Sequence, residues 1–220
     1  MGPVLATVLA TNVAPTAGLW LPAIAVLIGG WLLLGQRATE PPIVPRVHGV
    51  ASGSLLRSGG MIVLTLVFAG TGSIFGATDV STVAFAEAQG DKSAAGWVLA
   101  VFACGSMISG LGYGLKHWTS PLWRRFVTGV LALAAGVSLF FVVTSLPVLA
   151  AVMFVTGFTI APTIINGNSL VTTFVRKDQL TTGLAWIGTA LGVGVSIGSA
   201  VAGAVIDRSG AHGGFLVVAA

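Results

Sequence analysis

The chain has 220 residues, of which 55% are hydrophobic and 7% are charged, and its mean hydropathy is +0.99. Soluble domains carry about 25% charged residues, so this composition excludes a chain whose surface faces water. The net charge of +4 rests on ten Lys and Arg residues, too few to form the basic stripe of a nucleic-acid-binding protein. We therefore expect the lipid bilayer, and no nucleic acid, as a partner.

Long uncharged stretches predict membrane-spanning helices. A helix crosses the hydrocarbon in roughly 20 residues, and backbone polar groups in lipid must bond internally. These stretches are apolar on all faces and do not alternate, which favours helices over barrel strands. The sequence predicts an all-α, polytopic membrane helix bundle with six full spans, at residues 17–35, 58–85, 93–115, 122–143, 147–174 and 180–206.

Two apolar segments are too short to cross a bilayer, residues 3–11 near the start and residues 214–220 at the end. A chain does not ordinarily begin and end inside hydrocarbon. We therefore expect a fragment of a longer protein or a truncated gene product. The alternative is that both segments lie in the plane of the membrane interface.

Basic residues sort to one side of the predicted spans. The connections 36–59, 116–125 and 174–179 alternate along the chain, so they share one side, and they hold eight of the ten basic residues. Only Lys92 and Arg208 fall on the other side. The positive-inside rule places the three basic connections in the cytoplasm and predicts a multi-pass protein of the plasma membrane.

Local motifs add a resemblance to the major facilitator superfamily. The Pro- and Arg-containing stretch 36–59 resembles the long cytoplasmic loop between the two six-helix halves of that family. Gly2-Pro3 resembles the Gly-Pro signature in helix five of the antiporter branch. Gly110-Leu-Gly-Tyr-Gly-Leu-Lys116 resembles the glycine ladder between helices eight and nine, without its usual acidic residue. The run from Gly192 to Gly210 resembles helix eleven and its exit, and residues 75–85 resemble helix seven of actinobacterial members.

This resemblance implies a domain organisation. Residues 1–35 would be the end of helix five and helix six of the N-terminal half, 36–59 the cytoplasmic central loop, and 60–220 the C-terminal-half bundle, from helix seven to the start of helix twelve. Missing N-terminal helices, or a second copy of the chain, would complete the bundle. The implied function is that of a permease moving a small solute by alternating access, with proton-coupled export as the mode. The alternative is a non-transporting membrane scaffold or assembly subunit.

Polar and aromatic residues within the spans are candidates for a substrate or ion pathway. Asp79 comes first, because an ionisable group in a span is costly and a carboxylate in a low-dielectric cavity suits proton coupling. The alternative for Asp79 is a solvated position at the outer mouth. The full set is Thr71, Ser73, Phe75, Asp79, Asn166, Asn168 and Trp186. Helix–helix hydrogen bonding is the alternative for the two asparagines, and an interfacial anchor for Trp186.

Small residues four positions apart predict close helix packing, because this spacing lines one helix face. In a transporter, helix faces lined by small residues would let neighbouring helices rock against each other. The alternative is that these residues only allow static packing. The residues are Ser106, Gly110, Gly114, Gly188, Gly192, Gly194 and Gly198.

Signatures of other functions are missing. No phosphate-binding loop of the Gly-x-x-x-x-Gly-Lys type occurs, and His48, His117 and His212 show no metal-ligand spacing. Gly167-Asn168-Ser169-Leu170 hints at an intramembrane serine protease, but no helix-borne histidine could serve as its base. We expect no catalytic residue, no metal and no cofactor, and therefore not an enzyme.

Overall fold

The computed structural model describes residues 16–36 and 58–219, and the chain divides into two units, residues 1–54 and 55–220. In the first unit the described element is helix α2, Ala17–Gly35, which is apolar and exposed along nearly its whole length. The short apolar segment 3–11 and most of the predicted central loop lie outside the described residues.

The second unit is helical throughout its described part, with no strand. Its elements are α3 (Gly59–Ala88), α4 (Ala94–Leu115), α5 (Leu122–Ser138), the 3-10 helix η3 (Leu139–Val142), α6 (Leu146–Phe174), the 3-10 helix η4 (Lys177–Gln179), α7 (Leu180–Ser209) and α8 (Ala211–Ala219). Within the described ranges, six helices are long and apolar enough to cross a membrane. The predicted all-α membrane bundle with six spans is confirmed.

Glycine and proline define several helix ends. Gly90 and Gly210, with φ of 80° and 77°, follow α3 and α7 in a left-handed conformation that glycine adopts without steric cost. The N–H of Gly210 donates to the carbonyl of Ile206 at 2.8 Å and so closes the last turn of α7. Pro147 lies in the first turn of α6, where its missing N–H costs no helical hydrogen bond.

Three helices differ from their predicted extents, and one of them, α7, continues to Ser209, three residues past its predicted end. Helix α3 continues to Ala88, so Glu87 belongs to it as Asp79 does; both side chains are exposed, and charge on an exposed face does not interrupt a helix. Helix α5 ends earlier, at Ser138, and the chain tightens into η3 up to Val142. Such 3-10 turns are frequent at the C-terminal ends of α-helices.

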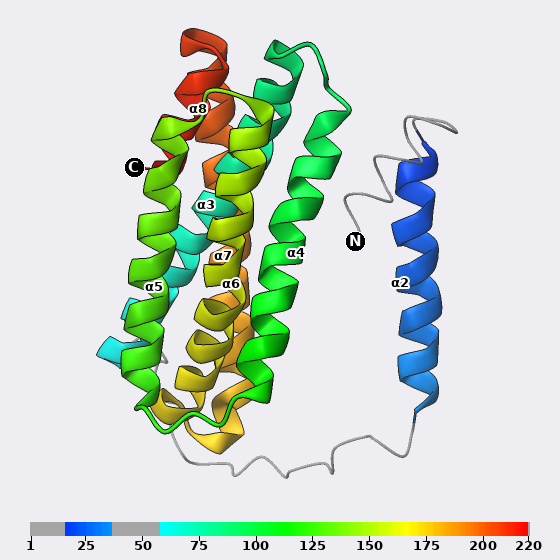
Figure 1. Cartoon of the computed structure of the whole chain (residues 1–220). Helices are drawn as coiled ribbons and strands as arrows, with labels where there is room; N and C mark the ends of the chain where they lie inside the picture. Colours follow the sequence, from blue (N-terminus) through cyan, green and yellow to red (C-terminus); the bar gives the residue numbers. More distant parts are fainter. Residues whose placement is uncertain (1–15, 37–57, 220) are drawn as a thin grey trace. The chain divides into compact units, whose positions relative to one another are not determined.

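The bundle is built from paired helices. Helix α3 packs along α7, α4 and α5 pack along α6, and α8 packs against both α3 and α7 (Figure 1). One buried cluster includes Phe85, Phe140 and Phe215 and joins α3, η3 and α8. A second includes Phe68, Phe126 and Ile187 and joins α3, α5 and α7 at the other end of the bundle.

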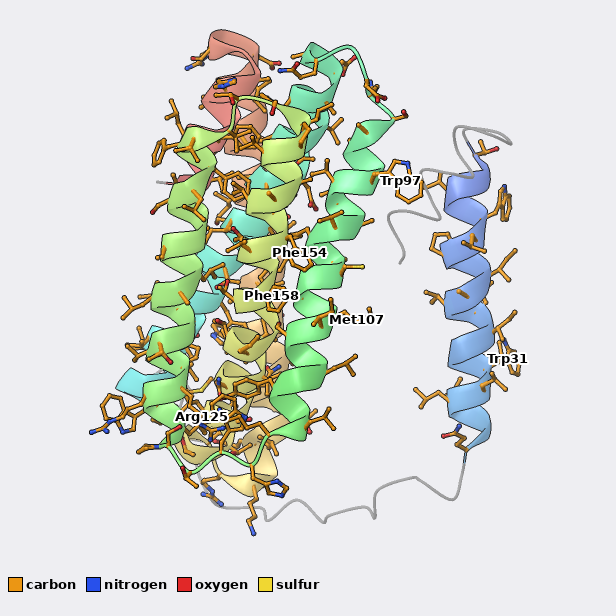
Figure 2. The ribbon with its side chains drawn as sticks, viewed as in Figure 1. Trp31, Trp97, Met107, Arg125, Phe154 and Phe158 are labelled. Atoms are coloured by element: carbon orange, nitrogen blue, oxygen red, sulfur yellow. The ribbon has the colours of Figure 1, made fainter. Side chains whose placement is uncertain are left out.

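Large apolar side chains cover the outside of the bundle. Trp97 and Met107 project outward from α4 (Figure 2), and Leu115 at its end is 84% exposed. In water such a surface would drive aggregation. In a bilayer it is the expected lipid-facing surface, since lipid tails are as apolar as these side chains.

The turn between α3 and α4 is polar and lies outside the spans. The carboxylate of Asp91 accepts hydrogen bonds from the hydroxyl of Ser93 at 2.6 Å and from the N–H of Ala94 at 3.2 Å. These bonds favour the ionised form and hold the pKa of Asp91 below its ordinary value. Lys92 and Glu87 form an exposed ion pair at 3.1 Å, which contributes little stability because water screens it.

Candidate functional site

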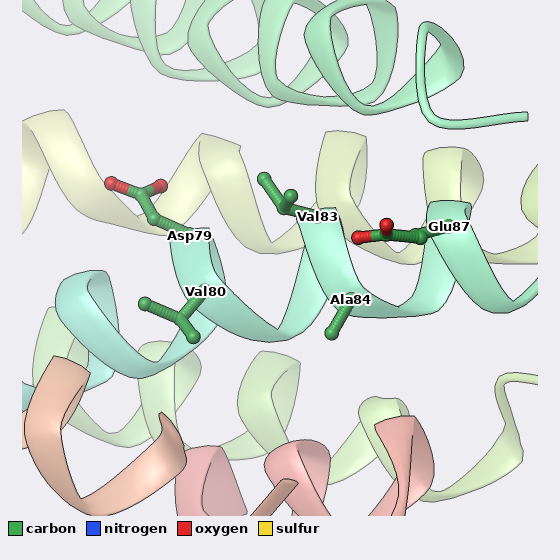
Figure 3. Close-up of a pocket in the computed structure, with 5 residues that line it drawn as sticks. All are labelled: Asp79, Val80, Val83, Ala84 and Glu87. Atoms are coloured by element: carbon green, nitrogen blue, oxygen red, sulfur yellow. The ribbon is translucent and has the colours of Figure 1, made fainter. Parts of the chain in front are cut away.

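Asp79 lies on the exposed side of α3, within the membrane-spanning segment. With Val80, Val83, Ala84 and Glu87 it lines a shallow pocket along this helix. Figure 3 shows Asp79 and Val83 pointing to one side of α3 and Val80 and Ala84 to the other. All five lining residues come from α3, so no other described helix closes the pocket on its opposite side.

The depth of Asp79 follows from helix geometry. The 30 residues of α3 span about 45 Å, roughly 15 Å more than the hydrocarbon thickness. Asp79 lies nine positions before the end at Ala88, which places its Cα about 13 Å from that end. If α3 is centred in the bilayer, Asp79 lies about 6 Å inside the hydrocarbon boundary and Glu87 lies outside it.

The neighbouring candidates on α3 are more enclosed than Asp79. Thr71 is buried and donates to the carbonyl of Val67 at 2.8 Å. Ser73 is half-buried and lies 3.1 Å from the carbonyl oxygens of both Ala69 and Gly194. Its hydroxyl therefore belongs to the α3–α7 contact.

An aromatic pair links α3 to α4. Phe75 is half-buried and meets Phe102 edge to face, with ring centroids 6.0 Å apart. This geometry is typical of favourable aromatic packing.

The two asparagines of α6 have different environments. Asn166 is buried, and its side-chain amide donates to the carbonyl of Pro162 at 2.7 Å and accepts from the hydroxyl of Tyr113 at 2.8 Å. Asn168 is exposed, and its side chain makes no hydrogen bond within the described part of the chain. Asn166 therefore joins α6 to α4, while Asn168 faces away from the packed interior.

Trp186 on α7 is 42% exposed, and its indole N–H donates to the hydroxyl of Thr65 at 3.1 Å. Thr65 in turn donates to the carbonyl of Met61 in its own helix at 2.7 Å. The hydrogen bond thus holds the indole ring against α3, while part of the ring remains exposed on the surface of the bundle.

The small residues of α7 divide into two groups. A Cβ added at Gly194 or Gly198 would collide with the α3 backbone at Ala69 or Ser73. A Cβ at Gly188 or Gly192 would meet nothing within 4 Å. Only one of the two predicted glycine pairs therefore contacts another helix in the described structure, because the other pair lies on a different side of α7.

The small residues of α4 that were predicted to pack also differ in their contacts. A Cβ at Gly110 would lie 3.1 Å from Ala161 on α6, and the backbone N–H group of Ser106 lies beside Gly157 of the same helix. At Gly114 a Cβ would meet nothing within 4 Å, so Gly114 makes no helix contact among the described residues. It lies in the last turn of α4, beyond the close approach to α6.

Sequence reasoning missed the partners of these contacts. Gly72 and Gly76 lie on α3 opposite the backbone of Leu191 and Val195, and Gly105 and Gly157 face each other between α4 and α6. Gly72 and Gly76 have the same spacing of four as the pairs that were identified. That spacing in the sequence could have identified Gly72 and Gly76 as helix-packing residues.

A second missed feature lies where the chain turns from α4 to α5. Tyr113 and Trp118 stack with ring centroids 4.3 Å apart, and the indole N–H of Trp118 donates to the Tyr113 carbonyl at 2.9 Å. Arg125 of α5 donates to the Tyr113 hydroxyl at 3.3 Å. Figure 2 shows Arg125 at this end of the bundle. Because the stacked rings and the arginine come from separate elements, only the fold reveals the cluster.

Metal-ligating side chains do not gather in the described residues, where no three His, Cys, Asp or Glu side chains lie close enough to hold an ion. His117 lies in the α4–α5 turn, as expected. His212 lies in α8, where it packs against Phe85, so the expectation that no histidine belongs to a helix was wrong. His48 lies outside the described residues.

Comparison with known families agrees with the helical architecture. The family model described as Major Facilitator Superfamily matches residues 86–220, more than half of the chain. This region runs from the end of α3 through α8, so Asp79 lies outside it. No curated protein and no solved structure shows significant similarity to the chain. The chain is a multi-pass membrane protein and belongs to the Major Facilitator Superfamily of membrane transporters.

Proposed function

We propose that this chain contributes the C-terminal-half bundle of a permease that exports a small solute across the plasma membrane by alternating access, driven by protons. Family membership and six apolar helices support a membrane transporter. The observation that carries proton coupling is Asp79, an exposed carboxylate on a helix that is otherwise uncharged from Gly59 to Ala86.

The energetics favour an aqueous surrounding for Asp79. A charged side chain facing lipid costs at least about 2.5 kcal/mol at the bilayer centre, and ionisable residues in spans almost always face a cavity or a partner. No described residue forms an ion pair with Asp79. A water-filled path along this side of α3 would solvate the carboxylate and allow it to take up and release a proton.

Further residues would extend the path toward the other membrane face. Asn168 on α6 and Trp186 on α7 are exposed and carry groups that can hydrogen-bond or stack on a solute. Thr71, Ser73 and Phe75 would lie behind the wall and support it, since they are buried or half-buried. The path needs an opposite wall, which we expect from further helices of an actinobacterial-type transporter, N-terminal to this chain, or from a second copy.

Cysteine accessibility tests the water-filled path without knowledge of the solute. In a Cys104→Ser background, Val83→Cys should react with a membrane-impermeant maleimide, because Val83 shares the Asp79 side of α3. Leu66→Cys, whose parent side chain is 67% exposed and lies on the same helix, should stay unreactive because it faces lipid. Equal protection of both positions would contradict the path and favour a membrane scaffold.

Proton coupling has a separate readout. In vesicles that contain the complete transporter, Asp79→Asn should abolish solute-induced proton movement, measured with a trapped pH dye. Glu87→Gln should retain it, because Glu87 lies at the end of α3 and pairs with Lys92. If the asparagine variant moved protons at the wild-type rate, Asp79 would not be the coupling group.

A further inference from the structure

A cluster of basic and aromatic residues lies at the α4–α5 turn. We call Tyr113, Lys116, Trp118, Arg124 and Arg125 the basic–aromatic cluster. The ammonium group of Lys116 lies 4.5 Å from the centre of the Trp118 ring, and the guanidinium of Arg125 lies 5.7 Å from the same ring. Two like charges thus share one aromatic side chain, an arrangement that favours a nearby anion.

The cations of the cluster lack carboxylate partners. The ion pairs in the described part of the chain are Lys92 with Glu87 and Arg176 with Asp178, neither of which involves the cluster. Arg125 donates one hydrogen bond to Tyr113, while its Nε is buried and has no hydrogen-bond partner. A buried N–H donor without an acceptor is costly, so this Nε favours an anionic acceptor close to Arg125.

The start of α5 adds positive charge at the same place. Arg124 and Arg125 lie in the first turn of this 17-residue helix, which has no acidic residue there and no side-chain cap. The free N–H groups of a helix start carry a partial positive charge, which disfavours arginine and favours an anion. The helix start and the three basic side chains therefore point to the same kind of ligand.

Exposed tryptophans show at which depth this ligand would lie. Trp118 is 36% exposed and Trp123 is 57% exposed, and the guanidinium of Arg124 lies 5.2 Å from the Trp123 ring. Tryptophans at the ends of membrane-spanning helices lie at the level of the lipid headgroups. The anions of that layer are phosphates, which guanidinium groups bind with two parallel hydrogen bonds.

We propose that the basic–aromatic cluster is a binding site for the phosphate of an anionic phospholipid headgroup. Lys116 and Arg124, both exposed, would contact the phosphate directly. Arg125 would hold the Trp118 and Tyr113 rings in place and offer its unpaired Nε to the same phosphate. The site does not depend on proton coupling or on the transported solute. It would tie the α4–α5 turn to one membrane surface.

Native mass spectrometry of the full chain, released from detergent with an equal mixture of phosphatidylglycerol and phosphatidylcholine, tests the proposal. We expect phosphatidylglycerol to be retained preferentially. The double variant Lys116→Gln/Arg124→Gln should lose this preference by roughly five-fold for each charge removed. The matched double variant Lys177→Gln/Arg208→Gln removes the same net charge elsewhere and should keep it.

Two further measurements separate the outcomes. The charge-conserving double variant Lys116→Arg/Arg124→Lys should retain the preference, because the two positive charges remain. The glutamine variant should melt at the wild-type temperature without lipid, which excludes misfolding as the cause of its loss of preference. Phosphatidylglycerol should raise the melting temperature of the chain, whereas sodium phosphate should raise it no more than sodium chloride of equal ionic strength. An unchanged preference in the glutamine variant, or equal stabilisation by sodium phosphate, would overturn the proposal, the latter by revealing a free-anion site.

Discussion

At the residue scale, one hydroxyl group connects three helices. Tyr113 of α4 donates to Asn166 of α6 at 2.8 Å and accepts from Arg125 of α5 at 3.3 Å. Asn166 is only 1% exposed, so its side-chain oxygen has no water to replace a lost donor. These hydrogen bonds therefore connect α4, α5 and α6, and they explain why the Asn166 amide is tolerated inside an apolar bundle.

Tyr113→Phe should destabilise the bundle by about 1–2 kcal/mol, because it leaves a buried acceptor unpaired. The measurement is the free energy of unfolding in mixed micelles. Ser138→Ala is the control, since Ser138 is exposed and bonds only to Ala134 of its own helix. A phenylalanine variant as stable as the serine control would show that the Tyr113 hydroxyl contributes nothing.

At the element scale, α3 and α7 approach so closely that glycine is required on both sides. Gly72 and Gly76 accommodate the α7 backbone, and Gly194 and Gly198 accommodate the α3 backbone. Close backbone approach increases van der Waals contact, the main attraction between helices in lipid. We propose that this smooth surface also lets the two helices slide during alternating access.

Gly194→Ala should force the pair apart and cost about 1–3 kcal/mol, as overpacking does elsewhere. Gly188→Ala, six residues earlier on the same helix, should change stability by less than about 1 kcal/mol, because its Cβ meets nothing within 4 Å. Thermal unfolding of both variants in detergent compares them directly. Because alanine favours a helix more than glycine does, equal losses in both variants would mean that the close contact with α3 does not set the effect.

At the scale of the whole molecule, the sorting of basic residues predicts the orientation in the membrane. Lys116, Arg124 and Arg125 lie at one end of the second unit with Arg176 and Lys177, and Lys92 lies in the turn between α3 and α4 at the other end (Figure 1). The positive-inside rule assigns the first group to the cytoplasm, which remains a prediction.

Thiol labelling of intact cells tests this orientation, again in a Cys104→Ser background. Lys92→Cys should react with an impermeant maleimide from outside, while Arg46→Cys and Arg176→Cys should react only after the cells are opened. Protection of Lys92→Cys together with labelling of both arginine positions would reverse the orientation. Labelling of only one arginine position would disprove the number of spans between them.

The sequence by itself determined the number, order and approximate bounds of the spans. Each depends on local properties: an uncharged run long enough to cross lipid, Pro147 at a helix start and Gly210 after a helix end. Even the family resemblance, now supported over residues 86–220, rests on order and spacing along the chain.

Which side of each helix packs was decided only by the tertiary structure. Asn166 and Asn168 are two residues apart, about 200° around α6, yet one is buried and the other exposed. Gly188–Gly192 and Gly194–Gly198 have the same spacing, but only the second pair meets α3. In lipid both sides of a helix are apolar, so hydrophobic periodicity cannot mark the packed face, and only the neighbouring helices select it.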